Sequence, residues 1–495
     1  MTIRYKDSRA AAFVTTAAAI IALSSGAMAQ NVSANTSYIN NLNYDLKRLL
    51  TVDLRPSSQP LNDPRTEKDG AVIACTKKQH DVTSNLDSNA LLDPSQGVIY
   101  TGAVVKLDGD LVEGRPTPYS LARGPINIRL QLPGIGAAGN ITVANPNNIN
   151  VPAAIDNAIE DWFAGPNDEG YSPVVQAYSE ARKAYNQSQI GVELGFGAQW
   201  AKNSVTGSLN VHSTTTSTTT YQVFKQVYYS VILQEPGDAG SVFADSVRLN
   251  ASNMPSTHPP GFVRSVDYGR LIVVQMSTNE QLLKQDAEAA MSYVTSGGVT
   301  VSGNLKQKYE NIAKNSTFKV FAIGGGITSS PELVDLFAGD ATKVKDVIAG
   351  GLEFSKANPG VPIQYVVVDL KSRRVAAMES NTSYVDQSCQ TLANRSVKMM
   401  HRGVYVAKFT ASWQEWSQQQ NKFIGRSWDS GKKTNPWDHT LYFDGDAKSF
   451  IFKGINDTGL VWDKHRTVEW RFPALDGNKC LKVTGTTLNM GKTTC

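Results

Sequence analysis

A long alternation of apolar residues with small or polar ones constrains the fold of this chain more than any other feature. From Ile190 to Trp200 every second residue is apolar, and with switched parity the pattern continues from Val205 to Val211. A period of two places alternate side chains on opposite faces of a β-strand. A half-buried strand of a soluble sandwich shows the same pattern, but its usual length is about five or six residues. The greater length here favours a transmembrane hairpin, whose strands need about 9–11 residues each.

A second region combines this alternation with helix-forming residues. Residues 281–293 (QLLKQDAEAAMSY) are rich in good helix formers and carry apolar residues on one side, which predicts a helix. Directly downstream, Val299, Val301, Gly303 and Leu305 alternate with polar residues. Helical and strand character side by side indicates a segment that is able to change its secondary structure.

The N-terminus has the pattern of a secretory signal peptide over residues 1–29. It has a basic start, an apolar stretch over residues 10–23 and the small-residue cleavage site Ala27-Met28-Ala29. The alternative, a membrane-anchoring helix, is disfavoured because the apolar stretch is short and rich in Ala and Thr. No other window approaches the about 20 apolar residues of a transmembrane helix. The mature chain is therefore predicted to be secreted and initially soluble.

Composition supports several globular domains. The chain has 495 residues, 41% of them hydrophobic, and its net charge of +4 lies partly in the signal peptide, so nucleic-acid binding gets no support. In an oxidising compartment its cysteines are able to form disulfides. Cys480 and Cys495 flank a short C-terminal segment and are candidates to close a hairpin, whereas spacing does not establish a bond between Cys75 and Cys389.

The sequence shows no arrangement of residues that is typical of an enzyme. The six histidines are scattered, without metal-ligand spacing or an HExxH motif. Gly324-Gly325-Gly326 follows the strand-like residues 318–323 but lacks the Lys-Ser/Thr of a phosphate-binding loop, so a hinge or packing role is favoured. We therefore expect no enzymatic activity, no bound metal and no cofactor.

From about Asn394 onward, short apolar runs separated by turn residues predict a β-sandwich. Two segments there stand out, residues 456–466 (NDTGLVWDKHR) and residues 485–488 (GTTL). They resemble the tryptophan-rich undecapeptide, ECTGLAWEWWR, and the Gly-Thr-Thr-Leu loop of the cholesterol-dependent (thiol-activated) cytolysins. Other segments similar to the family's follow in family order along nearly the whole mature chain: residues 114–117 (GRPT), 125–128 (PINI), 132–134 (LPG), 188–190 (SQI), 268–270 (YGR) and 315–318 (NSTF).

This resemblance implies an α+β fold in an elongated, multidomain chain. Domains 1 to 3 are discontinuous and hold a twisted antiparallel sheet flanked by helical clusters, and domain 4 is a C-terminal β-sandwich. The implied boundaries are residues 30–52, 90–182, 233–269 and 353–376 for domain 1, 53–89 and 377–393 for the connecting sheet of domain 2, 183–232 and 270–352 for domain 3, and 394–495 for domain 4. The family's membrane hairpins correspond to about residues 193–221 and 283–313, which soluble family members fold as helices.

The activity implied by the resemblance is pore formation. A soluble monomer or dimer binds a cholesterol-containing target membrane, oligomerises into a ring with further copies of itself and inserts a β-barrel that lyses the cell. An isolated hairpin in lipid leaves backbone groups unpaired, each at a cost of several kcal/mol, so only a closed barrel is stable there.

The resemblance also implies which residues meet the membrane. Thr487 and Leu488 match the family's cholesterol-recognising pair. The undecapeptide residues implied in membrane contact and coupling are Thr458, Gly459, Leu460, Trp462, Lys464, His465 and Arg466. In the family, the last of these couples membrane contact to changes in the third domain.

Four further residues are implied in oligomerisation. Tyr185 and Phe318 match an aromatic pair that stacks between neighbouring subunits. Gly324 and Gly325 match paired glycines, after which a short strand swings away to uncover an edge strand.

Three of the positions at which the undecapeptide departs from the family bear on its function. Asp457 replaces the cysteine, so thiol activation is not expected, and Lys464 and His465 replace adjacent tryptophans. Tryptophan favours the membrane interface, whereas lysine keeps its ammonium among the headgroups, so we expect a weaker grip on the membrane. The alternative function is therefore that of a cytolysin-fold binding protein, which recognises a glycan, an anionic lipid or a protein receptor and forms pores weakly or not at all.

Overall fold

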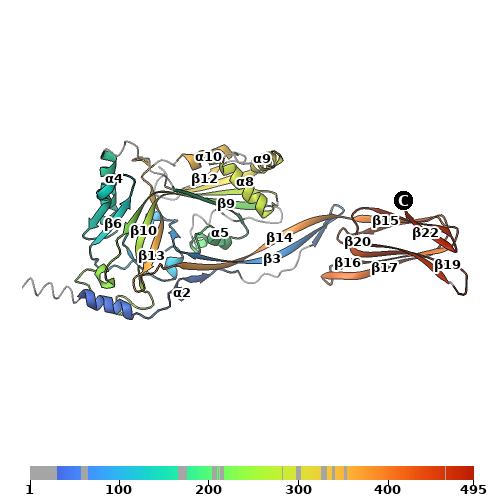
Figure 1. The fold of residues 1–495 in the computed structure, drawn as a ribbon, viewed down its shortest axis with the longest axis horizontal. Helices are drawn as coiled ribbons and strands as arrows, with labels where there is room; N and C mark the ends of the chain where they lie inside the picture. Colours follow the sequence, from blue (N-terminus) through green and yellow to red (C-terminus); the bar gives the residue numbers. More distant parts are fainter. Residues whose placement is uncertain are drawn as a thin grey trace, which may run out of the picture. The chain divides into compact units, whose positions relative to one another are not determined.

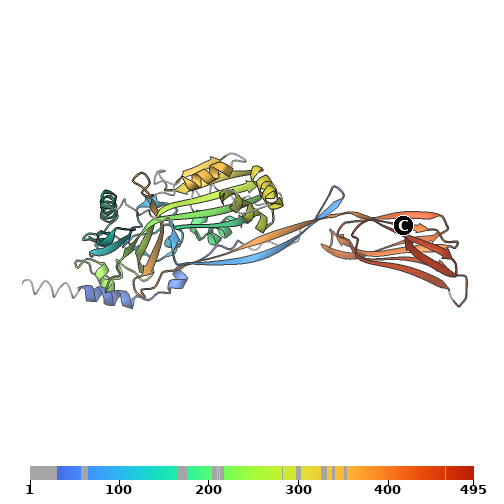
Figure 2. The same cartoon turned by 45° about the horizontal axis from the view of Figure 1, so that its top comes forward.

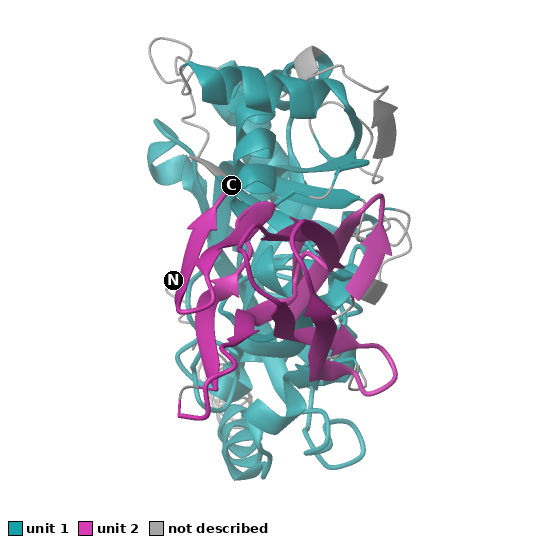
Figure 3. Cartoon of the chain, turned by 90° about the vertical axis from the view of Figure 1, so that its right-hand side faces the viewer, with its two compact units in different colours: residues 1–59, 79–385 teal, residues 60–78, 386–495 magenta. Residues whose placement is uncertain are grey.

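The computed structural model describes residues 31–56, 65–165, 176–202, 209, 211, 217–280, 282–296, 303–324, 332–336, 341–350, 354–462 and 464–495. The predicted signal peptide, residues 1–29, lies outside the described residues, as does Gly325. The chain divides into two compact units, residues 1–59 with 79–385 and residues 60–78 with 386–495 (Figure 3). The described elements form an α+β fold with mostly antiparallel sheets, as predicted.

A large sheet forms the centre of the first unit (Figure 1). Its strands follow the order β12-β11-β10-β9-β6-β7, and further strands pair with β9, β10 and β13 outside this path. The bounds are β4 Asn89–Ala90, β5 Val104–Lys106, β6 Ile126–Gln131, β7 Asn140–Val143, β8 Gln176–Ala184, β9 Thr218–Leu233, β10 Pro260–Thr278, β11 Ser316–Ile323, β12 Glu332–Leu336 and β13 Val361–Asp369. The long strands β9 and β10 are rich in β-branched and aromatic residues, which suit a buried sheet.

A bulge at Gly269 lets β10 change partners. The register of β10 with β9 shifts between Tyr268 and Gly269, and a Cβ at position 269 would overlap the carbonyl oxygen of Gln226. Only glycine allows two backbones to approach this closely. On one side of the bulge, residues 271–278 pair with β11, and on the other side residues 261–269 pair with β13.

Alternation within the strands separates two hydrophobic cores on opposite faces of this sheet. One core holds Val223, Leu271, Val273 and Phe321, which pack with Ile190, Leu194, Phe196 and Trp200 from the segment of α5 (Gln187–Glu193) and α6 (Gln199–Lys202). The other holds the intervening strand residues, which pack against α8 (Lys284–Ser296), α9 (Asn304–Lys314) and α10 (Ala341–Ala349). Helices therefore cover both faces of the sheet, as Figures 1 and 2 show.

The two regions of alternating sequence are helical where the structure describes them. Ile190 to Trp200 folds as α5, a turn and α6, so its alternation does not form a strand in this form of the protein, in agreement with the helices that the resemblance implies for soluble family members. Gly195 and Gly197 have positive φ angles, and Gly197 N donates to the carbonyl of Gly191, which closes the turn. Most of residues 203–216 lie outside the described residues.

In the second region, the helix predicted over residues 281–293 is present as α8. The alternating residues Val299 and Val301 lie outside the described residues, and Leu305 belongs to α9, so a strand at Leu305 is wrong for this form. Among the described helices, none combines the length and the apolar character needed to cross a bilayer.

The remaining elements of the first unit surround a third core. Its helix α4 (Asn150–Ala164) buries Ile155, Ile159 and Trp162, whose spacing places them on one helix face. The other elements are a helix over residues 31–41, α2 Leu46–Leu49, η1 Pro94–Gln96, α3 Gly109–Val112, η2 Gly136–Gly139 and η4 Ala239–Val242.

A four-stranded sheet, of order β1-β14-β3-β2, contributes residues to both units. Its strands are β1 Thr51–Asp53, β2 Arg65–Lys68, β3 Ala71–Leu86 and β14 Met378–Ala393. Within the second unit, a disulfide joins Cys75 of β3 to Cys389 of β14.

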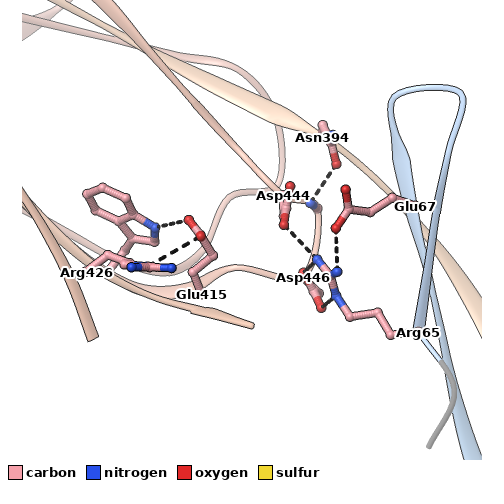
Figure 4. Close-up of polar contacts among 9 residues, drawn as sticks. Arg65, Glu67, Asn394, Glu415, Arg426, Asp444 and Asp446 are labelled. Carbon is pink, nitrogen blue, oxygen red and sulfur yellow. Dashed lines mark hydrogen bonds and ion pairs between the residues drawn. The ribbon is translucent and has the colours of Figure 1, made fainter. Parts of the chain in front are cut away.

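An ion-pair cluster fixes the β2–β3 hairpin to the sandwich of the second unit (Figure 4). Arg65, whose side chain is 7% exposed, contacts Asp446 Oδ2 at 2.8 Å and Asp444 Oδ2 at 2.7 Å. Asn394 adds two hydrogen bonds, since its N donates to the Gly70 carbonyl and its Oδ1 accepts from Gly445 N. Two-point contact between a guanidinium and a buried carboxylate fixes orientation as well as distance.

The rest of the second unit is a β-sandwich, which confirms the predicted C-terminal fold. One sheet has the order β18-β15-β21-β22 and the other β17-β16-β19-β20. Their bounds are β15 Arg395–His401, β16 Ala407–Ser417, β17 Lys422–Lys433, β18 Trp437–Phe443, β19 Lys448–Asp457, β20 His465–Ala474, β21 Lys479–Thr486 and β22 Asn489–Thr494. Inward-facing Phe409, Phe450, Phe452, Leu481 and Val483 fill the space between the sheets.

Candidate functional site

The undecapeptide-like segment forms the connection between β19 and β20. Asp457 ends β19 and His465 begins β20, and the two residues are register partners. Beyond them, Thr458 N donates to the carbonyl of Lys464 at 3.1 Å, which closes the base of the loop. Gly459 adopts a φ of +77°, a left-handed conformation that glycine favours. The loop is therefore fixed at its base and turns sharply above it.

The Thr487-Leu488 pair occupies the turn between β21 and β22. Thr486 and Asn489 pair across the hairpin, so Thr487 and Leu488 are its two turn residues. A disulfide joins Cys480 to Cys495 at the opposite end of this hairpin, where Cys495 N also donates to the Cys480 carbonyl. The covalent bond and the strand pairing together hold the turn in position.

Asn456 connects these two loops and was not singled out in the sequence. Its side chain is fully buried. Its Nδ2 donates to the Thr487 carbonyl at 2.7 Å, and its Oδ1 accepts from Arg466 N at 3.1 Å. The available signal was its place as the first residue of the undecapeptide-like segment, where the family motif has an acidic residue.

A third loop, residues 402–406, belongs to the same end of the sandwich. Its backbone follows the strand that leads to Thr487, because Arg402 N donates to the Val483 carbonyl and Val404 N to the Gly485 carbonyl. The Tyr405 hydroxyl donates to the Thr484 carbonyl at 2.9 Å. This loop was not among the sites expected from the sequence, although two valines beside Gly403 and Tyr405 were a weak signal for an exposed apolar turn.

Large apolar side chains at the ends of all three loops face solvent. Trp462 is 83% exposed, Val461 81%, Val404 72% and Leu488 54%. Single exposed apolar residues are ordinary, but several on neighbouring loops are typical of a surface that binds a membrane or a partner. Lys464 is exposed beside them.

Two of the residues that depart from the family motif contact each other. Asp457 Oδ1 lies 2.8 Å from His465 Nδ1, and Asp457 Oδ2 accepts from Lys432 Nζ at 2.7 Å. The Lys432 ammonium, with His465 as the smaller contribution, lowers the pKa of the Asp457 carboxyl below its usual value. With Ile455 and Thr467 these residues line a pocket of about 360 Å³ at the base of the loop.

The residues predicted to act in oligomerisation lie in the first unit. Tyr185 stacks on Tyr384 with ring centroids 4.4 Å apart, and Phe318 is buried in β11, where it pairs with Leu336 of β12. Gly324 follows β11 with a φ of +78°. Their roles between subunits stay predictions.

The described residues contain no group of three or more His, Cys, Asp or Glu side chains that is able to hold a metal ion. The candidate site consists of the three loops, whose exposed apolar side chains offer a binding surface. A helix-covered antiparallel sheet and a β-sandwich with exposed apolar loops make up the architecture of a cytolysin-type protein.

Comparison with known proteins agrees with this class. The thiol-activated cytolysin family matches residues 34–392, and the thiol-activated cytolysin beta sandwich domain matches residues 396–491. Seeligeriolysin of Listeria seeligeri is 31% identical over 476 residues, which cover 91% of this chain and 86% of that protein. Listeriolysin O of Listeria monocytogenes is 29% identical over 478 residues, with the same coverage of the two chains.

Solved structures of cytolysins share the fold of this chain. The crystal structure of listeriolysin O superposes with a TM-score of 0.71 at 26% identity, and covers 94% of this chain and 96% of its own. Pneumolysin superposes with a TM-score of 0.67 at 24% identity, covering 94% of this chain and 98% of its own. The chain belongs to the thiol-activated, or cholesterol-dependent, cytolysins, a family of pore-forming toxins that are not enzymes.

Proposed function

We propose that this protein is a secreted toxin that binds cholesterol-containing membranes, assembles into a ring and inserts a β-barrel pore. The observation that carries the proposal is the buried side chain of Asn456, which joins the Thr487-Leu488 turn to the undecapeptide-like loop. A sterol that contacts the turn would thereby be sensed at Arg466, the residue predicted to relay membrane contact. The four predicted domains, with residues 394–495 as the membrane-recognition domain, are part of this proposal.

The apolar loop ends supply the affinity for a bilayer. Burying a side chain the size of Val or Leu stabilises the bound state by about 1.5–3 kcal/mol. Trp462 adds an amphipathic ring that favours the interface. Because Lys464 must keep its ammonium among headgroups, the undecapeptide-like loop enters the bilayer less deeply than a loop with two further tryptophans would.

Assembly would begin at β11. The strand β12 covers one edge of β11 through only five residue pairs, and the left-handed Gly324 follows β11 directly. Removing a short strand from a sheet breaks few backbone hydrogen bonds. The departure of β12 would leave the backbone groups of β11 ready to pair with a neighbouring subunit. Residues 193–221 and 283–313 would then extend from helices into the barrel hairpins, with Tyr185 and Phe318 fixing the register between subunits.

The test is dye release from liposomes with and without cholesterol, in neutral and in anionic lipid, with binding measured separately. The double variant Thr487→Gly with Leu488→Gly should lose binding and leakage together, because the sterol contacts are removed. Asn456→Ala keeps both residues but removes the hydrogen bond to Thr487, so we expect weaker binding and a larger loss of leakage.

The matched control is Tyr442→Ala. Tyr442 is as exposed as the loop residues, but it pairs with Ser396, at the opposite end of β15 from the loop over residues 402–406. Its removal should leave cholesterol-dependent binding unchanged. Unchanged binding by the Thr487 and Leu488 variant would contradict sterol recognition at this turn.

The alternative function is that of a binding protein with weak or no pore formation. The cation at Lys464 and the charged pocket of Lys432, Asp457 and His465 favour a glycan, an anionic lipid or a protein receptor. The fold itself does not decide between the two functions, since a non-hemolytic pneumolysin also superposes with a TM-score of 0.66 at 23% identity. Binding to liposomes without leakage, or binding that is independent of cholesterol, would favour this alternative.

A further inference from the structure

The first unit contains a cavity that the proposed pore function does not use. It has a volume of about 580 Å³, within the range of ordinary small-molecule sites. Its floor is apolar and buried, and consists of Ile126, Leu233, Val242, Phe243 and Phe262. Polar groups of Asn127 and Gln234 also line it. Apolar and polar groups contribute about equally to the lining, which suits a small polar ligand more than an apolar one.

Arg123 is the cation of this cavity, and it has no counterion among the described residues. Its Nε donates to the Val242 carbonyl at 2.9 Å, which uses one of the five guanidinium N–H groups. The residue keeps part of its surface accessible to solvent, yet burial lowers its pKa to about 10. Tyr100 is the titratable group that interacts with Arg123, and burial raises the pKa of its phenol, so it carries no charge at neutral pH. A desolvated guanidinium without an anion is destabilising on its own.

The backbone around Arg123 is held firmly in place. The Val242 carbonyl also accepts from Gly124 N, and Ala244 N donates to the Ala122 carbonyl, so residues 122–124 run alongside residues 242–244. A Cβ at Gly124 would overlap the Ser241 carbonyl oxygen, so only glycine allows this close approach. The guanidinium is therefore held at the cavity wall.

The helix over residues 31–41 also contributes to the cavity lining and is tied to the same segment. Asn31 Nδ2 donates to the Asp245 carbonyl, and Gly240 N donates to Thr36 Oγ1, so the helix over residues 31–41 is fixed against the loop that follows β9. Val32 of this helix lines the cavity. The cavity is thus formed by segments far apart in the sequence and is not a gap beside one loop.

We propose that this cavity is a binding site for a small oxyanion, a phosphate or a carboxylate, held by the guanidinium of Arg123. The planar fork of arginine matches the oxygens of either group, and charge-assisted hydrogen bonds of this kind are the strong ones. Two carboxylates, Glu235 and Asp245, also line the cavity, but both are exposed, so water weakens their repulsion of an anion. The site is separate from the three loops and independent of the proposed pore function.

The test is calorimetric titration and thermal unfolding of the full mature chain with inorganic phosphate and, separately, with acetate, at constant ionic strength. We expect saturable binding of one anion per chain and a rise in the unfolding midpoint that follows the same saturation. Arg123→Gln should reduce the affinity by about tenfold or more, because charge-assisted hydrogen bonds are lost. In anion-free buffer this variant should be at least as stable as the parent, since it no longer buries an unpaired cation.

Three variants separate a site from a general charge effect. Arg123→Lys keeps the charge without the fork and should bind with intermediate affinity. Glu235→Gln removes a repulsive charge and should bind at least as tightly as the parent. Arg115→Gln, an exposed arginine already paired with Asp110 and Glu113, should leave binding unchanged. Binding of phosphate but not acetate would identify a phosphate-type ligand. The absence of saturable binding by either anion, or undiminished binding by Arg123→Gln, would overturn the proposal.

Discussion

At the level of single residues, the contact between Asp457 and His465 gives the altered undecapeptide a physical explanation. Asp457 replaces the family's cysteine and His465 replaces a tryptophan, and the two residues are partners in the β19–β20 register. Asp457 contacts both His465 and Lys432, and these polar contacts hold the base of the loop together. The two substitutions are therefore coupled, and a change at one position alters the surroundings of the other.

This pair makes the loop base sensitive to acid. The pKa of Asp457 is lowered in the folded chain, so its stabilising contribution is complete above the unfolded value of about 3.9 and is lost as the pH falls through the lower, folded value. The contribution of the Asp457 carboxylate is therefore present at neutral pH, and below about pH 4 it disappears. We expect amide exchange of residues 456–466 in the parent to approach that of Asp457→Asn only below this pH.

The measurement is hydrogen exchange of parent and variant at matched pH values, which cancels the intrinsic effect of pH on exchange. Asp429→Asn serves as the control, because its carboxylate is paired with Lys408 outside this loop. Equal exchange of the parent and Asp457→Asn at pH 7 would show that the pair does not close the loop.

At the level of elements, the proposed conformational change would depend on β11 and its two neighbours. β10 pairs with one edge of β11 over eight residues, whereas β12 covers the other edge with five. Since the pairing with β12 is the shorter one, β12 is the neighbour whose departure would break fewer backbone hydrogen bonds. Oligomerisation should therefore be blocked when β12 is fixed to β11.

Val320→Cys with Val334→Cys tests this expectation. The two residues are register partners, and the Cα separation of about 4.5–5.5 Å in an antiparallel pair suits a disulfide. The oxidised variant should bind liposomes but release no dye, and a reductant should restore leakage. The parent treated with the same reductant is the control, because it contains two native disulfides. Full leakage from the oxidised variant would contradict the release of β12.

At the level of the whole molecule, the two disulfides act over different lengths of chain. Cys75 and Cys389 are 314 residues apart, and Cys480 and Cys495 are 15 apart. In the chain-entropy description, the Cys75–Cys389 bond stabilises the folded state by about 5 kcal/mol or more, and the Cys480–Cys495 bond stabilises it by about 3 kcal/mol. The longer loop contains most of the first unit, so its effect depends on whether both units unfold together.

We expect Cys75→Ser with Cys389→Ser to lower the unfolding midpoint more than Cys480→Ser with Cys495→Ser, measured by calorimetry. The second variant should instead show the larger loss of liposome binding, because its disulfide closes the hairpin that carries Thr487 and Leu488. If Cys75→Ser with Cys389→Ser lowers the unfolding midpoint less than Cys480→Ser with Cys495→Ser does, the folded first unit already holds β3 and β14 together while the sandwich unfolds.

The sequence by itself determined the family, the C-terminal sandwich and the helix at α8. Motifs such as residues 456–466 and 485–488 are local in the chain, and helix-forming composition acts over one segment, so neither depends on distant contacts. Thr487, Leu488 and the undecapeptide-like residues were also found in this way. Their exposure at neighbouring loops agrees with the sequence-based prediction, although their binding role stays a proposal.

Apart from the family resemblance, only the tertiary structure decided the conformation of Ile190 to Trp200, and it alone decided the connections within the site. The alternation there fits a strand, but burial of Phe196 and Trp200 beneath the central sheet selects α5 and α6, because packing outweighs local pattern. The bond from Asn456 to Thr487, the pairing of Asp457 with Lys432 and the cavity at Arg123 join segments far apart in the chain. Such contacts depend on which surfaces fold against each other, and no spacing along the sequence encodes that choice.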